Sequence, residues 1–310
     1  MNIPQKTLSL FAGASLLAFS SLSAVTTDPV GYVTETIKPS GFNLIASNLS
    51  GSVVASGSLN SADTTTVTDT SASFTSSLSG STDYVLVLTS GANTGINTVV
   101  SASSATAVAT GDDLSSLVSE GDTYEIREIV TVADLFGATN SAELAGATAG
   151  NTSTADIVWI QNDTGYTKVY YNAVARTFPP LSVGWKGTTT GNADASGTPV
   201  YFTDAIWVQV QRSAFSSDEA GVDSSDLTSK GIVFSGSVLT HSSEVATESG
   251  FNFINRIFPG DISLADAGLE SDIAHATAGN TTDADLIWVP DGSGGYNKYC
   301  LLYTSDAADE

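Results

Sequence analysis

The sequence predicts an all-β fold of antiparallel sandwich or barrel-like modules. One module is interrupted by a small inserted β-barrel domain, and each module carries one short helix. Two observations predict this architecture. Val, Ile, Tyr and Trp cluster in short runs that are separated by stretches rich in Ser, Thr, Gly and Asp, a pattern typical of turn-rich β proteins. Several stretches also recur in the same order along the chain, which indicates repeated modules.

The first residues have the layout of a secretory signal peptide. Lys6 lies in a short polar lead, an apolar stretch runs from Leu8 to Phe19, and small residues precede the sequence VTTDP. We expect residues 1–24 to be removed on export, because the apolar stretch is too short to span a bilayer comfortably. No later stretch of the sequence is apolar for long enough to form a membrane helix. The mature protein is therefore expected to be extracellular, on the cell surface or periplasmic.

The chain is strongly acidic, with 33 acidic against 10 basic residues and a formal net charge of −23. A polyanion repels nucleic acid and anionic lipid, so we expect no nucleic-acid partner. We interpret the charge as a means of staying soluble outside the cell. A length of 310 residues with 41% hydrophobic content allows two or three domains with sizeable cores.

Three stretches recur in the same order and organise the chain. SGFNLI at 40–45 recurs as SGFNFI at 249–254, and TVAD at 131–134 recurs as SLAD at 263–266. ATAGNTSTADIVWI at 147–160 recurs as ATAGNTTDADLIWV, identical at nine of 14 positions. The distance between copies falls from 209 to 132 residues between the first and second matches. The first copy therefore holds about 77 residues that the second lacks.

This change in spacing predicts the domain boundaries. The first β module comprises residues 25–49 plus 129–238, an inserted small β domain occupies 50–128, and a truncated second β module occupies 239–299. The insertion contains strand-like runs separated by turn residues: GSVVASGS, TTTVTD, DYVLVLTSG, GINTVVS, ATAVAT and DTYEIRE. The stretch DDLSSLV is expected to add at most one helical turn.

In both modules a short helix is expected after the insertion point. Thr131 precedes Asp134 by three residues, as Ser263 precedes Asp266, which is the spacing of a helix N-cap with an acidic group near the positive end of the helix. Strand-like runs follow: ADIVWIQN, YTKVYYN, VGWKG, AIWVQVQR and GIVFSGSV. The sequence DTG at 163–165 is a hairpin signal, and DGSG has that role in the second copy.

The alternation of side chains assigns faces to these strands. In AIWVQVQR the apolar residues share one face, and Trp207 lies with two glutamines on the opposite, polar face. In GYTKVYYN the residues Tyr166, Lys168 and Tyr170 share a face, so an aromatic side chain lies beside a cation. DIVWI is apolar on both sides and is expected to be a central strand.

The order of these motifs resembles a family of uncharacterised exported bacterial β-rich proteins with a repeated GFNLI, DxIWV, GYxKYY, GW and AxWxQ module. The matching residues here are Phe42, Asp156, Trp159, Gly165, Tyr166, Lys168, Tyr170, Tyr171, Gly184, Trp185, Trp207, Gln209 and Phe234. Arg212 comes one residue later than the pattern of the family expects. The resemblance covers most of the mature chain and implies no activity.

The last residues, CLLYTSDAADE at 300–310, depart from the first copy at Cys300. They resemble the translation of a transposase sequencing adaptor, so we expect a non-native tail after Tyr299. Because Cys300 is the only cysteine, no disulfide is expected to stabilise the protein.

The aromatic strands supply the candidate ligand-binding residues, which are Trp207, Tyr166, Lys168, Tyr170 and Trp185. Flat apolar faces next to hydrogen-bonding groups suit sugar rings, so these side chains could line a shallow carbohydrate platform. The alternative is that they are core residues, as aromatic side chains in β strands usually are.

The sequence offers little sign of metal or catalytic chemistry. A weak calcium candidate is the acidic loop with Asp218, Glu219, Asp223 and Asp226, which has oxygen ligands but not the spacing of a recognised loop. We expect no other metal and no cofactor. The available bases are His241 and His275; since Gly146 takes the place of His275 in the first copy, we expect surface histidines and no enzymatic activity.

These observations favour an exported, non-enzymatic structural or adhesion protein of the cell surface or extracellular space. Its expected partner is an extracellular glycan or another surface protein. One alternative is a carbohydrate-binding module, and a second is a fragment of an extracellular polysaccharide-active enzyme.

Overall fold

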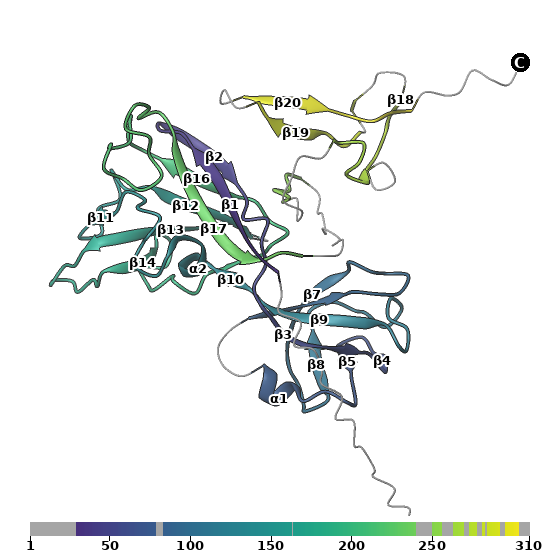
Figure 1. Ribbon diagram of the computed structural model, residues 1–310. Coiled ribbons are helices and arrows are strands. Elements are labelled where there is room, and N and C mark those ends of the chain that lie inside the picture. The colour runs from purple at the N-terminus through teal and green to yellow at the C-terminus, as the bar shows by residue number, and fades with distance from the viewer. Residues whose placement is uncertain are drawn as a thin grey trace, which may run out of the picture.

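The computed structural model describes residues 29–78, 83–162, 164–239, 250–255, 263–269, 273–277, 281–282, 284–291 and 295–303. These residues form an all-β protein of several sheets with two short helices in the described ranges (Figure 1). The predicted all-β fold class is therefore confirmed. The predicted signal peptide, 1–24, and the last residues of the predicted tail, 304–310, lie outside the described residues.

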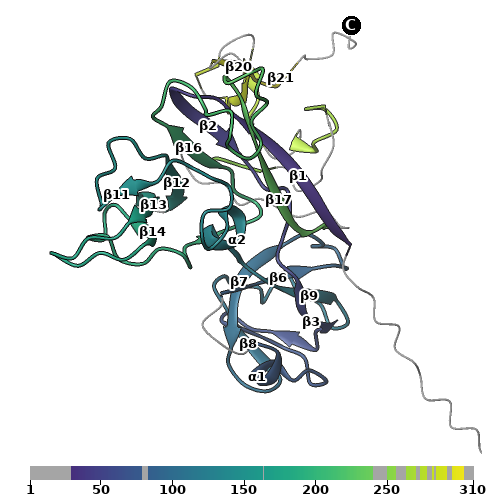
Figure 2. The ribbon, with the colours of Figure 1, turned by 60° about the vertical axis from the view of Figure 1, so that its left-hand side comes forward.

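The main sheet has six strands in the order β11-β13-β12-β16-β2, with β14 pairing β13. Their bounds are β11 (Ala147–Thr148), β13 (Gly165–Val174), β12 (Ile157–Asn162), β16 (Ile206–Val210), β2 (Gly41–Ile45) and β14 (Gly184–Gly187). A second layer is an antiparallel ribbon of β1 (Val30–Ile37) and β17 (Lys230–Ser237). Figure 2 shows this ribbon crossing the sheet near β2 and β16. We call the main sheet, the ribbon and α2 together the sandwich.

The core of the sandwich lies between these two layers. Val158 of β12 and Val208 of β16 are fully buried, and Ile232 and Phe234 of β17 are no more than 2% exposed. The alternation of AIWVQVQR thus buries its aliphatic face, as expected. Each such side chain contributes about 1.5–3 kcal/mol through removal of its apolar surface from water. The strand β12 lies between β13 and β16, so its predicted central position is confirmed.

The helix α2 (Val132–Phe136) begins at a capping box. The backbone N–H of Asp134 donates to Thr131 Oγ1 at 3.3 Å, and the backbone N–H of Thr131 donates to Asp134 Oδ2 at 2.9 Å. The helix buries Phe136 in the core and ends at Gly137, whose φ of 84° suits glycine. Two short strands, β10 (Val130–Thr131) and β15 (Pro199–Val200), pair beside it.

The equivalent stretch in the second copy has the same cap but no α-helix. Asp266 N–H donates to Ser263 Oγ at 3.1 Å, while residues 263–269 form turns and a single 3₁₀ position. The spacing therefore predicts the cap correctly in both places. A helix follows only where an apolar core receives its buried face.

A second sheet contains the strands between Val53 and Glu128 in the order β3-β9-β6-β7-β8-β5-β4. Their bounds are β3 (Val53–Ser58), β9 (Thr123–Glu128), β6 (Tyr84–Leu88), β7 (Asn97–Ala102), β8 (Ala107–Thr110), β5 (Thr66–Thr68) and β4 (Ser61–Ala62). Each of the six strand-like runs of the sequence contains one of these strands. The helix α1 (Phe74–Ser77) was not expected; its Phe74 fills the core of this sheet.

The two ends of this second sheet are consecutive pieces of one bent segment. Between β3 and β4, Leu59 N–H donates to Asp122 O at 2.8 Å, next to β9, and Asn60 N–H donates to Thr68 O at 2.8 Å, in β5. The segment 53–62 therefore supplies both end strands of the order, β3 and β4, and the sheet curls around its own apolar core.

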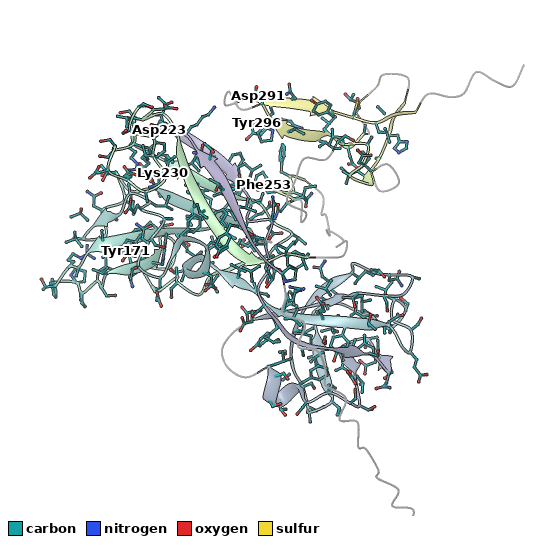
Figure 3. The ribbon with its side chains drawn as sticks, viewed as in Figure 1. Tyr171, Asp223, Lys230, Phe253, Asp291 and Tyr296 are labelled. Carbon is teal, nitrogen blue, oxygen red and sulfur yellow. The ribbon has the colours of Figure 1, made fainter. Side chains whose placement is uncertain are left out.

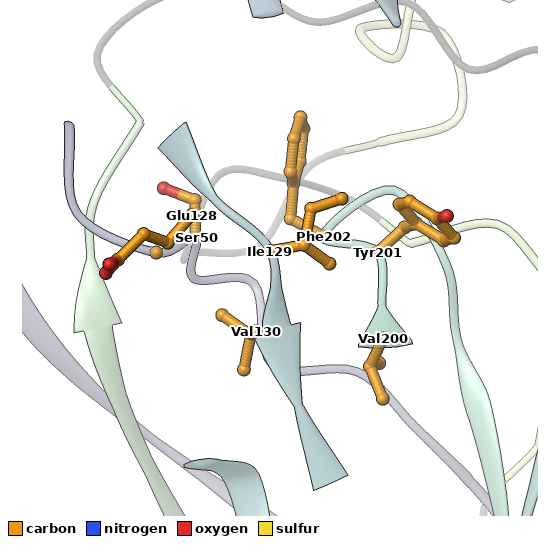
Figure 4. Close-up of a pocket in the computed structure, with 8 residues that line it drawn as sticks. Ser50, Glu128, Ile129, Val130, Val200, Tyr201 and Phe202 are labelled. Carbon is orange, nitrogen blue, oxygen red and sulfur yellow. The ribbon is translucent and has the colours of Figure 1, made fainter. Parts of the chain in front are cut away.

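The second sheet meets the sandwich at a small apolar junction. Val85 and Val87 of β6 pack with Ile129, Phe202 and Leu239. The residues around it leave only a shallow hollow (Figure 4), which is lined by Ser50, Gly51, Glu128, Ile129, Val130, Val200, Tyr201 and Phe202. Because side chains fill most of this junction, we treat it as packing and not as a binding site.

The last described strands form two small pairs. β19 (Ile287–Pro290) and β20 (Tyr296–Tyr299) make an antiparallel hairpin, and β18 (Ala276–Thr277) pairs in parallel with β21 (Leu302–Tyr303). Within the described ranges, none of the helices is long and apolar enough to cross a membrane.

Candidate functional site

The outer face of the main sheet, opposite the core, carries a cluster of aromatic side chains and one cation. β2 supplies Phe42, β16 supplies Trp207, β12 supplies Trp159, and β13 supplies Tyr166 and Lys168. The strand register places Trp159 directly across from Lys168 on one side and from Trp207 on the other. We call these five residues the aromatic face.

The rings of the aromatic face contact one another edge to face. Phe42 lies 5.3 Å from Trp159 and 6.0 Å from Trp207 between ring centroids, and Trp159 lies 5.7 Å from Tyr166. Such T-shaped pairs contribute about 0.5–1.5 kcal/mol each beyond their burial. Lys168 Nζ lies 3.6 Å from the centre of the Trp159 ring, a cation–π contact. The cluster is therefore an interlocked layer of rings.

The indole of Trp159 is held from the side as well. Its Nε1–H donates to Gln209 Oε1 of β16 at 3.2 Å, and Gln209 is the register partner of Phe42. The glutamine that the sequence places on the polar face with Trp207 thus satisfies the polar edge of a neighbouring ring.

A segment far along the chain covers part of the aromatic face. Phe253 lies 5.4 Å from Trp207 and 6.1 Å from Tyr166 between ring centroids. Figure 3 shows Phe253 beside the sheet of the sandwich. Its segment, residues 250–255, is the second occurrence of the GFN stretch that forms β2.

Hydrogen bonds hold this segment in an extended form. Ala205 N–H donates to Phe253 O at 3.0 Å, and Asn255 N–H donates to Thr203 O at 2.7 Å. The side-chain amide of Gln161 donates to Phe251 O at 2.8 Å and accepts from Phe253 N–H at 3.3 Å, so it pairs with the segment as a backbone amide would.

Asn255 adds a buried side-chain bond. Its Nδ2 donates to Phe202 O at 2.7 Å, and the residue is 6% exposed. We call the set of receiving groups the clamp: Gln161, Tyr166, Trp207 and the backbone of 202–205.

Two of the sequence candidates do not belong to this surface. Tyr170 points to the same side of β13 as Lys168 but is fully buried beneath Ala147 and Ala155. Its hydroxyl donates to Asn192 Oδ1 at 2.8 Å, and burial raises the pKa of this phenol. It therefore presents no ring to a ligand.

Trp185 lies on the opposite side of the sheet. It is 1% exposed, packs against Phe136 and Tyr171, and donates its Nε1–H to Gly137 O at 2.9 Å. Trp185 is thus a core residue. The structure brings together only Trp207, Tyr166 and Lys168 among the sequence candidates, and adds Phe42 and Trp159.

The same contacts recur in the last described hairpin. Trp288 lies 5.5 Å from Phe251 and 5.9 Å from Tyr296 between ring centroids, and Lys298 Nζ lies 3.9 Å from the centre of the Trp288 ring. Phe251, Trp288, Tyr296 and Lys298 occupy the sequence places of Phe42, Trp159, Tyr166 and Lys168. Comparing the two copies residue by residue is the signal that could have found Phe42 and Trp159.

The four carboxylates of the acidic loop are engaged by partners within the protein. Glu219 accepts a bond from Lys230 Nζ at 3.0 Å and also pairs with Arg212. Asp223 and Asp226 accept bonds from Ser225 and Thr228, and these bonds lower the pKa of both carboxyls. Asp218 in turn bonds the hydroxyl of Ser216. In the described part of the chain no three His, Cys, Asp or Glu side chains gather where they could hold a metal ion.

A buried ion network instead ties loops of the sandwich together. Asp156 is 1% exposed, and its Oδ2 lies 3.1 Å from Nη2 of Arg212. The same oxygen accepts the backbone N–H of Ala145 at 2.8 Å. Burial raises the pKa of this carboxyl, although the N–H of Ala145 and the charge of Arg212 act against the rise. Asp285 accepts the N–H of Ala274 in the same way, also at 2.8 Å.

His275 is half-buried next to β18, and His241 lies outside the described residues. Comparisons of the chain with protein-family models, with curated proteins and with solved structures found no match.

Proposed function

We propose that the chain is an exported, non-enzymatic structural or adhesion protein of the cell surface or extracellular space, built from repeated β modules. Its modules are joined when the GFN stretch of one docks on the aromatic face of the preceding one. The contact of Phe253 with Trp207 and Tyr166 carries this proposal.

The geometry of the rings supports packing over ligand stacking. Ring edges meet ring faces throughout the aromatic face, and Lys168 occupies one face of Trp159. A sugar stacks on an open ring face, whereas an interlocked layer with one more aromatic ring placed on it suits a contact between protein modules. We call this contact, between residues 250–255 and the aromatic face, the joint. The chain as a whole carries a formal net charge of −23, which suits solubility outside the cell.

The joint can be tested by small-angle X-ray scattering on the full chain. Phe253→Ala removes the ring that contacts Trp207 and Tyr166, so the radius of gyration should increase as residues 263–303 separate from the sandwich. Phe178→Ala is the matched control, because Phe178 is 88% exposed and lies on a loop away from the joint. Unchanged scattering by Phe253→Ala would contradict the joint. Hydrolysis of a polysaccharide, ester or peptide that is lost on a single substitution would contradict the non-enzymatic role.

A second candidate function is carbohydrate binding at the recurring cluster. Trp288 and Tyr296 are 38% and 37% exposed, and Lys298 lies beside them as a hydrogen-bond donor. A glycan array would detect this function as binding that is lost in Trp288→Ala. Absence of any Trp288-dependent binding would rule in favour of the structural role.

A further inference from the structure

The clamp holds its segment through two side chains that the first copy lacks. SGFNLIA at 40–46 and SGFNFIN at 249–255 differ at only two of seven positions. Leu44 stands where the second copy has Phe253, and Ala46 stands where it has Asn255. These two positions are also the ones whose side chains enter the clamp.

Each of the two side chains makes a contact that its counterpart cannot make. Phe253 places its ring edge-on against Trp207 at an interplanar angle of 85°, and leucine has no ring for this geometry. Asn255 donates to Phe202 O from a position that is 6% exposed. Alanine there would leave the buried Phe202 carbonyl without this donor, and an unsatisfied buried acceptor is unfavourable.

The remaining contacts of the clamp are hydrogen bonds to the backbone of the segment, which do not depend on its side chains. Gln161 bonds to Phe251 O and Phe253 N–H, and Ala205 N–H bonds to Phe253 O. In strand-addition sites, backbone bonds of this kind supply affinity and pockets for alternate side chains supply specificity. Phe253 and Asn255 are such an alternate pair, two residues apart.

We propose that the clamp is a peptide-recognition site selective for an extended segment with Phe and Asn two residues apart. Its partner is an uncharged Phe-x-Asn strand, of which residues 250–255 are the occupant in this chain. This inference rests on the proposed joint and adds that the joint is sequence-selective, so that it accepts the second copy of the stretch and rejects the first.

The test uses the full chain and two synthetic peptides, SGFNFIN and SGFNLIA, carrying a fluorescent label. The double variant Phe253→Leu with Asn255→Ala gives the docked segment the residues of the first copy and should free the clamp. This variant should bind SGFNFIN saturably in fluorescence anisotropy. Wild type should bind SGFNFIN at least about tenfold more weakly than the double variant does. Its own tethered segment competes with the peptide at an effective concentration of about millimolar.

Selectivity is the decisive reading. SGFNLIA should bind the double variant at least about tenfold more weakly than SGFNFIN, the loss expected for about 1.4 kcal/mol. Adding Gln161→Ala to the double variant should weaken SGFNFIN as well. Both sets of substitutions lie outside the apolar core, and matching circular dichroism melts would show that the variants are folded.

Equal binding of the two peptides, or no binding of either to the folded double variant, would overturn this inference. Equal binding would leave the joint itself in place, whereas the scattering experiment on Phe253→Ala judges the joint alone. If the double variant does not fold, excess SGFNFIN added to wild type should still increase its radius of gyration by displacing the segment, and SGFNLIA should not. No such difference would also overturn the inference.

Discussion

Phe253 packs edge-on against Trp207 with ring centroids 5.4 Å apart, although the two residues belong to stretches that the sequence assigns to different modules. Trp207 is fixed by β16, whose alternate residues are buried in the core. Phe253 is fixed by the backbone N–H of Ala205, which donates to its carbonyl, and by the side chain of Gln161. A rigid sheet face therefore contacts a short extended segment. Residues of the joint can be substituted without changing the core of the sandwich.

Trp207 and Trp185 should respond differently to substitution, since they lie on opposite faces of the sheet. Trp185→Ala should lower the free energy of unfolding by about 3–5 kcal/mol, because it empties a core site. Trp207→Ala should cost less and should loosen the segment 250–255. Urea denaturation followed by circular dichroism measures the first effect, and scattering measures the second. A larger loss of stability in Trp207→Ala than in Trp185→Ala would contradict this assignment of faces.

The buried ion network gives a second prediction. Glu219→Gln should destabilise the protein by about 3–5 kcal/mol, because it removes the charge that pairs with the fully buried Lys230. Asp218→Asn, at the neighbouring residue, is the control and should change stability by no more than about 0.5 kcal/mol. Since Glu219 is already paired, millimolar calcium should leave the melting temperature of wild type unchanged. A calcium-dependent increase would restore the calcium loop.

The helix cap gives a third prediction with a control from the second copy. Thr131→Ala should destabilise the protein by about 1 kcal/mol, because Thr131 Oγ1 accepts an N–H at the start of α2. Ser263→Ala removes the same bond from a turn that carries no α-helix, so its effect should be smaller. Thermal denaturation of the two variants measures the difference, and equal losses would mean that the caps have equal weight.

The sequence predicts the strands that carry the recurring motifs, but not what covers them. Alternation in AIWVQVQR correctly places Trp207 opposite the core, because the period of two is a property of the strand itself. GWKG is too short to show alternation, so Trp185 could not be assigned to the core. Alternation gives Tyr170 its correct side of β13, but the residues that cover it are Ala147 of β11 and Ala155 of the loop that follows, and no local pattern specifies their placement over the sheet.

Long-range pairing accounts for the other differences. β1 was not expected, because VGYVTETI mixes small, charged and apolar residues and becomes a strand by pairing with β17 about 200 residues later. The clamp could not be predicted from the sequence for a similar reason. Gln161 and Phe253 are separated by 92 residues, and a glutamine on a strand gives no sign that its amide will bond to another backbone.

The joint should also respond to pH through Asp204. Its backbone pairs with that of Ile254 in an isolated bridge, and burial raises the pKa of its carboxyl from 3.8 to about 6, against a small opposing effect of the Thr203 hydroxyl. An acid with a raised pKa in the folded state binds its proton more tightly there than in the unfolded chain. The stabilising contribution of the protonated Asp204 carboxyl is therefore fully present below pH 3.8 and is lost as the pH rises through about 6.

Asp204→Asn mimics the protonated form, so between pH 6 and 8 this variant should melt at a higher temperature than wild type. The melting temperatures of the two proteins should converge as the pH falls toward 4. Thermal melts of both across this range decide the matter; a difference that does not shrink on acidification would show that Asp204 is not the titrating group.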